Sequence, residues 1–158
     1  MITINLAEIP FDGMRLVGKT DRDIFDLPET ERDARPAGPV HYDLHISEAG
    51  SGLMLAMGSL RVTFTLRCVA CLEEFPHTIE WDDYAAEFDL PASGVLDLTE
   101  RIREDLLLEL PDYPHCDRDS DDPDRVCPAA GKFDGSAAAA GDGPSVWEAL
   151  DRLPKPRE

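Results

Sequence analysis

The feature that most constrains this chain is a run of nine residues in which apolar and polar side chains alternate. The apolar members share one parity, and they are Leu60, Val62, Phe64, Leu66 and Cys68. Successive side chains of a β-strand point to opposite faces of a sheet, so this period indicates a strand with one buried face. Neighbouring runs repeat the pattern, and their members are Val40, Tyr42, Leu44, Ile46, Leu53, Leu55, Met57, Phe75, His77, Ile79 and Trp81. Residues 40–90 are therefore expected to form antiparallel sheet.

The residues around these runs predict the irregularities of the sheet. The stretch SEAGSG is rich in small and polar residues and predicts a turn between two strands. The pair Asp82-Asp83 interrupts the apolar pattern and predicts a bulge. The residues that continue the strand after it are Tyr84, Ala86 and Phe88. A further strand is expected at the amino terminus, where the alternating residues are Ile2, Ile4 and Leu6.

The period of the apolar pattern changes near residue 97 and predicts a helix. Asp97 and Glu100 have the spacing of a capping box, whose side chains satisfy free amides at a helix start. Apolar residues then recur at helical spacing, and they are Leu98, Ile102, Leu106, Leu107 and Leu110. Pro111 is expected to end this helix, and the apolar stripe is expected to pack against the sheet.

The composition of the chain changes after the helix. Residues 112–143 are rich in proline, aspartate and small residues, which is typical of an irregular acidic segment and a linker. Residues 144–158 begin with proline, and an apolar stripe predicts a short helix that ends at Pro154. The stripe consists of Val146, Trp147, Leu150 and Leu153.

Two cysteines stand at the end of the clearest strand, in the sequence RCVACLEEF. Cys68 and Cys71 form a C-x-x-C motif, and the only other cysteines are Cys116 and Cys127. A thioredoxin-type redox pair normally lies where a strand enters a helix, whose N-terminus lowers the pKa of the first thiol. Here the motif lies between two expected strands and acidic residues follow it, which disfavours redox chemistry. A reducing compartment would also disfavour a permanent disulfide.

A structural zinc ion fits these cysteines better. The C-x-x-C turn can deliver two thiolates to one tetrahedral ion, and Cys116 and Cys127 can supply the other two. Four protein ligands leave no position for a substrate, so the expected role is to hold the 112–143 segment against the sheet. His115, His77 or a carboxylate is an alternative for one ligand, and four unligated cysteines are the alternative to any metal.

Together these elements predict an α+β fold: an antiparallel β-rich sheet or partial barrel, one packed helix and a metal-stapled C-terminal segment. Residues 1–111 are expected to form the sheet-and-helix domain, residues 112–143 the acidic cysteine segment and linker, and residues 144–158 the short C-terminal helix and tail. The pattern leaves open whether the sheet closes into a barrel. The polar residues 20–38 carry a small apolar anchor, which consists of Ile24, Phe25 and Leu27.

Other candidate sites have weaker signals. The acidic loop at 117–124 begins like a calcium-binding EF-hand, but Asp122 replaces the required glycine and Pro128 the required glutamate. An EF-hand is therefore excluded, and a solvated acidic loop or a docking surface is expected. His41 and His45 would lie about 13 Å apart on a strand, too far apart to share a metal ion. The sequence has no P-loop, dinucleotide-binding, nucleophile-elbow or zincin motif, so neither an enzyme nor a small-molecule substrate is expected.

The charge balance is strongly acidic. The chain has 33 acidic and 15 basic residues, a net charge of −18 and an isoelectric point of about 4.4. Such a charge repels phosphates and attracts cationic surfaces, so the expected partner is a basic protein and contact with RNA is expected to be indirect or weak. A need for solubility accounts for the same charge equally well. The sequence has no signal-peptide pattern and no membrane-spanning apolar stretch, which predicts a cytoplasmic protein without a membrane partner.

Three stretches resemble the YceD family, whose members are implicated in the accumulation of 23S ribosomal RNA. LRCVACLEEF at 66–75 is similar to the family's strand ending in C-x-R-C-L-x-x-F. LTERIREDLLLELPDYPHC at 98–116 is similar to its EDILLALP helix, and VCPAAGKF at 126–133 to its G-L-C-P-x-C-G-x-N segment. The four cysteines fall where family members often carry cysteine. Ala70 and Ala130 depart from the family, which usually has arginine at the first position and often cysteine at the second.

The resemblance implies a non-enzymatic accessory factor in ribosome biogenesis, which supports the synthesis, processing or accumulation of 23S rRNA. With the charge, it implies action through a basic partner, either a ribosomal protein or an rRNA-processing factor. Two alternatives remain at this point. One is an acidic zinc-binding module for protein interaction that is unrelated to ribosomes, and the other is a thiol oxidoreductase that works through Cys68 and Cys71. Neither the oligomeric state nor the partner's identity follows from the sequence.

Overall fold

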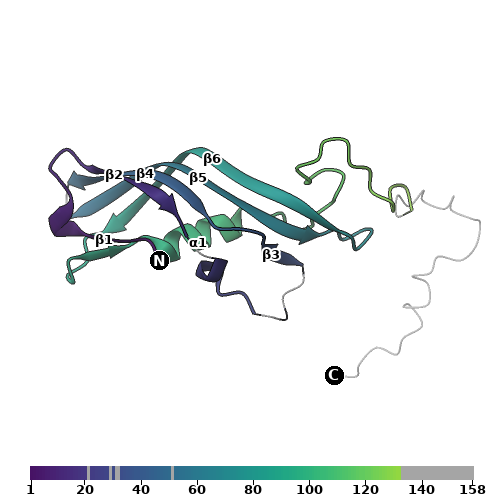
Figure 1. Ribbon diagram of the computed structural model, residues 1–158, viewed down its shortest axis with the longest axis horizontal. Helices are drawn as coiled ribbons and strands as arrows, with labels where there is room; N and C mark the ends of the chain where they lie inside the picture. Colours follow the sequence, from purple (N-terminus) through teal and green to yellow (C-terminus); the bar gives the residue numbers. More distant parts are fainter. Residues whose placement is uncertain (21, 29, 31–32, 51, 133–158) are drawn as a thin grey trace, which may run out of the picture. The chain divides into compact units, whose positions relative to one another are not determined.

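An antiparallel sheet that curls into a half barrel, together with one α-helix, builds the described fold (Figure 1). The computed structural model describes residues 1–132 except 21, 29, 31–32 and 51. The strands are β1 (Thr3–Asn5), β2 (Met14–Lys19), β3 (Ala34–Pro36), β4 (His41–Gly50), β5 (Leu53–Arg67), β6 (Glu74–Asp89) and β7 (Val95–Asp97). The helical elements are η1 (Leu6–Glu8), η2 (Arg22–Phe25) and α1 (Thr99–Leu108). The expected α+β class is therefore confirmed.

The half barrel is built around a meander of three strands. β4, β5 and β6 follow one another in the chain and pair in antiparallel fashion. β2 pairs with the outer edge of β4, and the short β3 pairs with the last part of β5. Among the described strands β2 and β6 lie at opposite edges and the short β3 is an edge beside the last part of β5, so the sheet is an open half barrel. β1 and β7 form a separate two-stranded ribbon.

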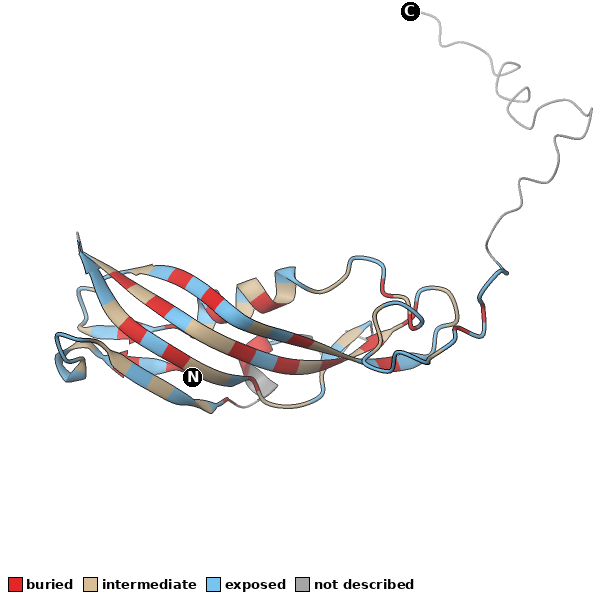
Figure 2. Ribbon diagram, turned by 90° about the horizontal axis from the view of Figure 1, so that it is seen from above, coloured by how far each residue is buried: buried red, intermediate tan, exposed pale blue. Residues whose placement is uncertain are grey.

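The long strand β5 supplies the centre of the core. Buried and exposed residues alternate along β5 and β6 (Figure 2). The expected inward residues Leu60, Val62, Phe64 and Leu66 are at most 1% exposed. The inward-facing, even-numbered positions of β5 extend toward its start through Gly58 to the buried residues Ala56 and Met54. The alternation predicted for Leu53, Leu55 and Met57 therefore marks the outer face, because the glycine does not break the strand.

The predicted bulge in β6 is confirmed. Gly58 pairs with Tyr84 and Leu60 with Trp81, so two residues of β6, Asp82 and Asp83, stand opposite one residue of β5. An extra residue reverses which face the following side chains occupy. The buried positions accordingly change from odd-numbered residues before the bulge to even-numbered residues after it.

Helix α1 packs its apolar stripe against the concave face of the sheet (Figure 1). Leu98, Ile102 and Leu106 are fully buried. The helix ends at Leu108, two residues before the expected Leu110, and its last turn tightens as Leu110 donates its amide to Leu107 O.

The start of α1 is fixed by the amino-terminal ribbon. Asp97 Oδ1 accepts the amide of Thr99 at 2.9 Å, but Leu98 occupies the N-cap position and makes no side-chain cap hydrogen bond. The expected capping box is therefore not formed, and Glu100 pairs with Arg103 instead. Thr99 Oγ1 accepts the amide of Ile2 at 2.8 Å, and the Leu98 amide donates to Ile2 O at 2.9 Å.

The apolar anchor predicted within residues 20–38 is present. Ile24 and Phe25 are buried, and the Phe25 ring meets the Phe64 ring edge-on at 5.0 Å between centroids. Leu27 is half-buried. η2 thus lies beside α1 and places Phe25 against β5. The linker and the helix expected at 134–158 lie outside the described residues. No helix in the described part of the chain combines the length and apolar character that a membrane crossing requires.

Candidate metal centre

The tip of the β5–β6 hairpin carries the first two cysteines. After the last pair of the ladder, Arg67 and Glu74, the Cys68 amide donates to Glu73 O and the Leu72 amide donates to Cys68 O, both at 2.9 Å. We call residues 68–73 the cysteine turn. Leu72 adopts a left-handed conformation with φ of 65°. This conformation closes the turn tightly, so that Cys68 and Cys71 present their thiols on the same side.

The chain after α1 brings the other two cysteines to this turn. Pro114 O accepts the amide of Val69 at 2.9 Å, which anchors the segment beside the cysteine turn. Cys116 follows in a turn closed by the Asp119 amide, which donates to His115 O at 2.8 Å. The segment then follows β6 and returns to place Cys127 against Cys68.

The four sulfur atoms form a cluster in which every pair lies within 4.8 Å. The Sγ atoms of Cys68 and Cys127 are 3.9 Å apart, and those of Cys71 and Cys116 are 3.6 Å apart. These distances exceed the ~2.05 Å of a disulfide, and all four thiols are free. A tetrahedral site with metal–sulfur bonds of about 2.3 Å requires sulfurs about 3.8 Å apart. The cluster therefore matches a site that could hold a metal ion.

Burial shields this cluster from solvent. Cys68, Cys116 and Cys127 are at most 3% exposed, whereas Cys71 is half-buried. Within the described residues, the metal-binding group contains cysteine alone. The histidines considered as alternative ligands are not part of it: His77 Nδ1 contacts Asp119 O at 2.6 Å, and His115 binds Asp119 through its backbone amide.

The surroundings of the cysteines shift the pKa of Cys68 downward and the pKa values of Cys71 and Cys116 upward. Burial raises the pKa of the Cys68 thiol, but backbone hydrogen bonds outweigh it and bring the pKa to about 6. The donors are the amides of Cys71, Cys116 and Ala70. Burial raises the pKa of Cys71 above its ordinary value and that of Cys116 to about 12. Backbone amides from the cysteine turn and from Cys116 thus stabilise one thiolate, and a bound cation would supply the field that ionises the buried thiols.

Arg125 supplies a positive charge next to the cluster. A side-chain hydrogen bond with Cys116 raises the pKa of the Arg125 guanidinium. The same guanidinium donates to Glu74 O at 3.1 Å and lies over the Phe75 ring, 5.9 Å from its centroid. Four thiolates around a divalent ion carry two excess negative charges, which a guanidinium offsets in part. Arg125 is not among the site residues expected from the sequence, and its position two residues before Cys127 is the one sequence signal for it.

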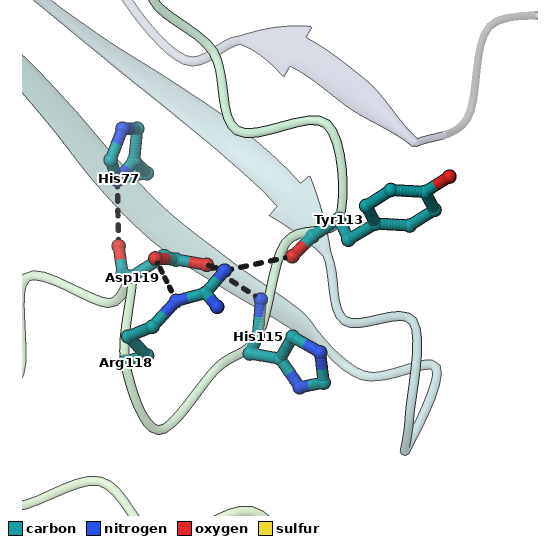
Figure 3. A network of polar contacts seen from close by, with 5 residues as sticks. All are labelled: His77, Tyr113, His115, Arg118 and Asp119. Atoms are coloured by element: carbon teal, nitrogen blue, oxygen red, sulfur yellow. Dashed lines mark hydrogen bonds and ion pairs between the residues drawn. The ribbon is translucent and has the colours of Figure 1, made fainter.

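A polar network around Asp119 holds the segment that follows Cys116 (Figure 3). Both oxygens of Asp119 accept hydrogen bonds from Arg118 at 2.8 Å, and Oδ2 also accepts the His115 amide at 2.8 Å. Arg118 donates in addition to Tyr113 O at 2.9 Å. These bonds from both sides of Cys116 fix the backbone that carries it.

Asp121 joins the same segment to the edge of β6. Its two carboxylate oxygens accept the amide and the hydroxyl of Thr78, both at 2.7 Å, and its own amide donates to Pro76 O at 3.0 Å. Most of the acidic loop at 117–124 is exposed, as expected, including Asp117, Asp121, Asp122 and Asp124. Asp119 and Asp121 nevertheless bind the protein, which the sequence did not predict. His41 and His45 are exposed on β4, as predicted.

Comparisons with protein-family models, with curated proteins and with solved structures found no match to this chain. The fold and the site define its class as a half-barrel β protein with a cluster of four cysteines that could hold a metal ion. The resemblance to the YceD family continues to rest on the three stretches of sequence.

Proposed function

We propose that this protein binds one structural Zn²⁺ ion through its four cysteines and acts as a non-enzymatic accessory factor in ribosome biogenesis, supporting 23S rRNA accumulation. One observation carries the proposal. The three stretches that resemble the YceD family meet at the cysteine cluster: the first supplies Cys68 and Cys71, the second Cys116 and the third Cys127. A shared structural centre gives a physical reason why motifs so far apart in the chain occur together.

Zinc is the metal that best suits this donor set. Soft thiolates in a tetrahedral arrangement favour zinc or iron–sulfur chemistry over calcium, magnesium or manganese. A closed four-cysteine zinc site has no open position for a substrate, which agrees with a structural role. The amides that lower the pKa of Cys68 would equally stabilise a zinc-bound thiolate, so its low pKa does not require a redox function.

Metal analysis tests the zinc assignment directly. The full chain, purified without a histidine tag or a chelator, is expected to contain one zinc per molecule and to lose it on Cys116→Ser substitution. Ala70→Ser is the matched control, because it adds a hydroxyl to the same turn and removes no ligand. Protein without zinc, or protein that carries iron with visible absorbance, would contradict the assignment.

Deletion of the gene in its own host tests the ribosomal role. The ratio of 23S to 16S rRNA is expected to fall and to recover with the wild-type gene and with Ala70→Ser, but not with Cys116→Ser. The partner is proposed to be a basic ribosomal protein or rRNA-processing factor, because the net charge of −18 opposes direct contact with RNA phosphates. An unchanged ratio would favour the alternative, an acidic zinc-binding interaction module unrelated to ribosomes.

A further inference from the structure

A groove between β6 and α1 offers a second site, separate in its residues from the cysteine cluster. It has a volume of about 370 Å³, and its lining includes Trp81, Asp83 and Tyr84 of β6 and Arg101, Asp105 and Glu109 from the α1 side. We infer that this groove docks an arginine side chain presented by a basic protein segment. The inference rests on the proposed function only in taking the partner to be a basic protein.

The aromatic wall of the groove is created by the bulge in β6. Trp81 and Tyr84 are three residues apart, so on a regular strand they would occupy opposite faces. The extra residue at Asp82-Asp83 brings them to one face, where their rings stack at 5.6 Å with an angle of 8° between planes. Bulges commonly redirect side chains in this way beside functional sites.

Hydrogen bonding holds this wall in place. The Tyr84 hydroxyl donates to Asp105 Oδ2 at 2.9 Å, and Asp105 also pairs with Arg101 at 3.1 Å. The Tyr84 ring is thereby tied to α1, while its partner Trp81 remains half-exposed in the groove. An indole face held in this way is the preferred surface for stacking of a planar guanidinium.

The charged side chains that line the groove favour a cationic ligand over an anionic one. Three carboxylates face a single guanidinium, and that guanidinium is already paired with Asp105. Asp83 and Glu109 make no ion pair or side-chain hydrogen bond within the described part of the chain, so both can receive a ligand's charge. Leu108 on the rim is 83% exposed and can cover the aliphatic stem of an arginine.

An arginine side chain can contact the aromatic wall, the carboxylates and the exposed Leu108 of the groove at the same time. Its guanidinium can stack on Trp81 while its donors bind Asp83 or Glu109, and its stem can contact Leu108. A lysine ammonium carries the same charge but is strongly hydrated and cannot stack as a plane. An anionic or nucleic-acid ligand would meet uncompensated carboxylates.

Peptide binding to the zinc-loaded full chain tests this inference. The probes are two labelled peptides with four arginines or four lysines on the same Gly-Ser backbone, titrated by fluorescence anisotropy in 150 mM salt. The double variant Asp83→Asn/Glu109→Gln is expected to bind the arginine peptide about tenfold more weakly, since neither carboxylate can then make a charge-assisted hydrogen bond with the guanidinium. Glu8→Gln/Asp12→Asn removes the same charge from exposed positions outside the groove and is expected to change binding less than twofold.

A third variant separates stacking from charge. Trp81→Leu keeps the carboxylates and is expected to abolish the preference for arginine over lysine. Equal weakening by the two double variants, or equal binding of both peptides to the wild type, would overturn the inference. Far-UV circular dichroism and melting temperature verify that each variant is folded.

Rescue of the deletion strain distinguishes failure of this inference from failure of the proposed function. If deletion lowers 23S rRNA and the Asp83→Asn/Glu109→Gln variant restores it fully, the groove does not dock the partner, although the ribosomal role stands. If deletion leaves 23S rRNA unchanged while the arginine peptide binds through the groove, the ribosomal role fails and the docking site stands.

Discussion

At pH 7 the Cys68 thiol is largely ionised, because its pKa is about 6, whereas Cys71 and Cys116 have raised pKa values and retain their protons. A metal ion can bind only the thiolate form, so binding must release the protons of Cys71 and Cys116. Each released proton makes the apparent affinity fall about tenfold for every unit of decreasing pH.

We therefore predict that the apparent zinc affinity falls at least about a hundredfold from pH 8 to pH 7. The affinity falls as the pH falls because, at pH values below the raised pKa values of Cys71 and Cys116, protons compete with zinc for these thiols. Competition with a chromophoric chelator, corrected for the pH dependence of the chelator itself, measures this slope. An affinity that does not change with pH would show that the buried thiols are already ionised in the absence of metal.

Asp119 lies in an acidic stretch of sequence, but hydrogen bonds to Arg118 and to the His115 amide hold its carboxylate against the protein. Its hydrogen bonds with Arg118, and then with the His115 amide, hold the pKa of its carboxyl below the ordinary value despite burial. A lowered pKa in the folded state means that the carboxylate stabilises the fold above the unfolded pKa of about 3.9. This contribution disappears as pH falls through the lower folded value.

Asp119→Asn is expected to reduce the free energy of unfolding by about 1–3 kcal/mol at pH 7, because charge-assisted hydrogen bonds are lost. The difference from wild type should shrink as the pH is lowered below about 4, where the carboxylate is protonated. Urea unfolding of both proteins at several pH values measures this. Asp117→Asn is the control, since this exposed neighbour makes no side-chain hydrogen bond in the described residues, and an equal loss in that variant would contradict the role of Asp119.

At the scale of elements, the register of the sheet depends on Gly58. A Cβ atom at this position would lie 2.0 Å from Asp43 O and 3.0 Å from Leu44 Cα, both in the neighbouring strand β4. Its φ of 151° is also unfavourable for other residues. The backbone of β4 cannot yield without separating from β5, so glycine is required at this close approach of the two strands.

Gly58→Ala is accordingly predicted to lower the free energy of unfolding by more than about 2 kcal/mol, through steric overlap with β4. Gly38→Ala is the matched control, because a Cβ there has no heavy atom within 4 Å and is expected to be near neutral. Thermal unfolding monitored by circular dichroism compares them. Similar melting temperatures for the two variants would show that β4 and β5 adjust more freely than their spacing implies.

The elements also show how far sequence patterns can determine this fold. β5, β6 and the Asp82-Asp83 bulge were predictable because a half-buried strand leaves an alternating pattern and a bulge interrupts it. β2 and β3 were not predicted, since β2 has no fully buried residue and β3 is three residues long. The cysteines could be grouped by their chemistry, but the contributions of Asp119 and Arg125 depend on tertiary placement, which no local pattern records.

Across the whole unit Met1–Pro128, two sources of stability are spatially separated. The sheet, α1 and η2 enclose an apolar core that includes Phe25, Phe64 and Ile102. The segment between Pro111 and Cys127 has few buried apolar side chains, and it is held by hydrogen bonds of Asp119, Asp121 and Arg125 and would be held further by a metal ion on the cysteine cluster. A segment with so little apolar burial cannot offset its conformational entropy without these links.

Removal of the proposed zinc ion should therefore release this segment while the half barrel stays folded. We predict that the zinc-free protein is cut by trypsin at Arg118 and Arg125, which flank the anchoring carboxylates, whereas Arg61 in β5 and Arg103 in α1 stay protected. Added zinc should restore resistance, because a ligand that binds only the ordered segment stabilises it in proportion to RT ln(1 + [Zn]/Kd). Mass spectrometry of the limited digest identifies the sites. Simultaneous cleavage at Arg61 and Arg103 would instead show that the metal holds the entire unit together, and that the apolar core is insufficient alone.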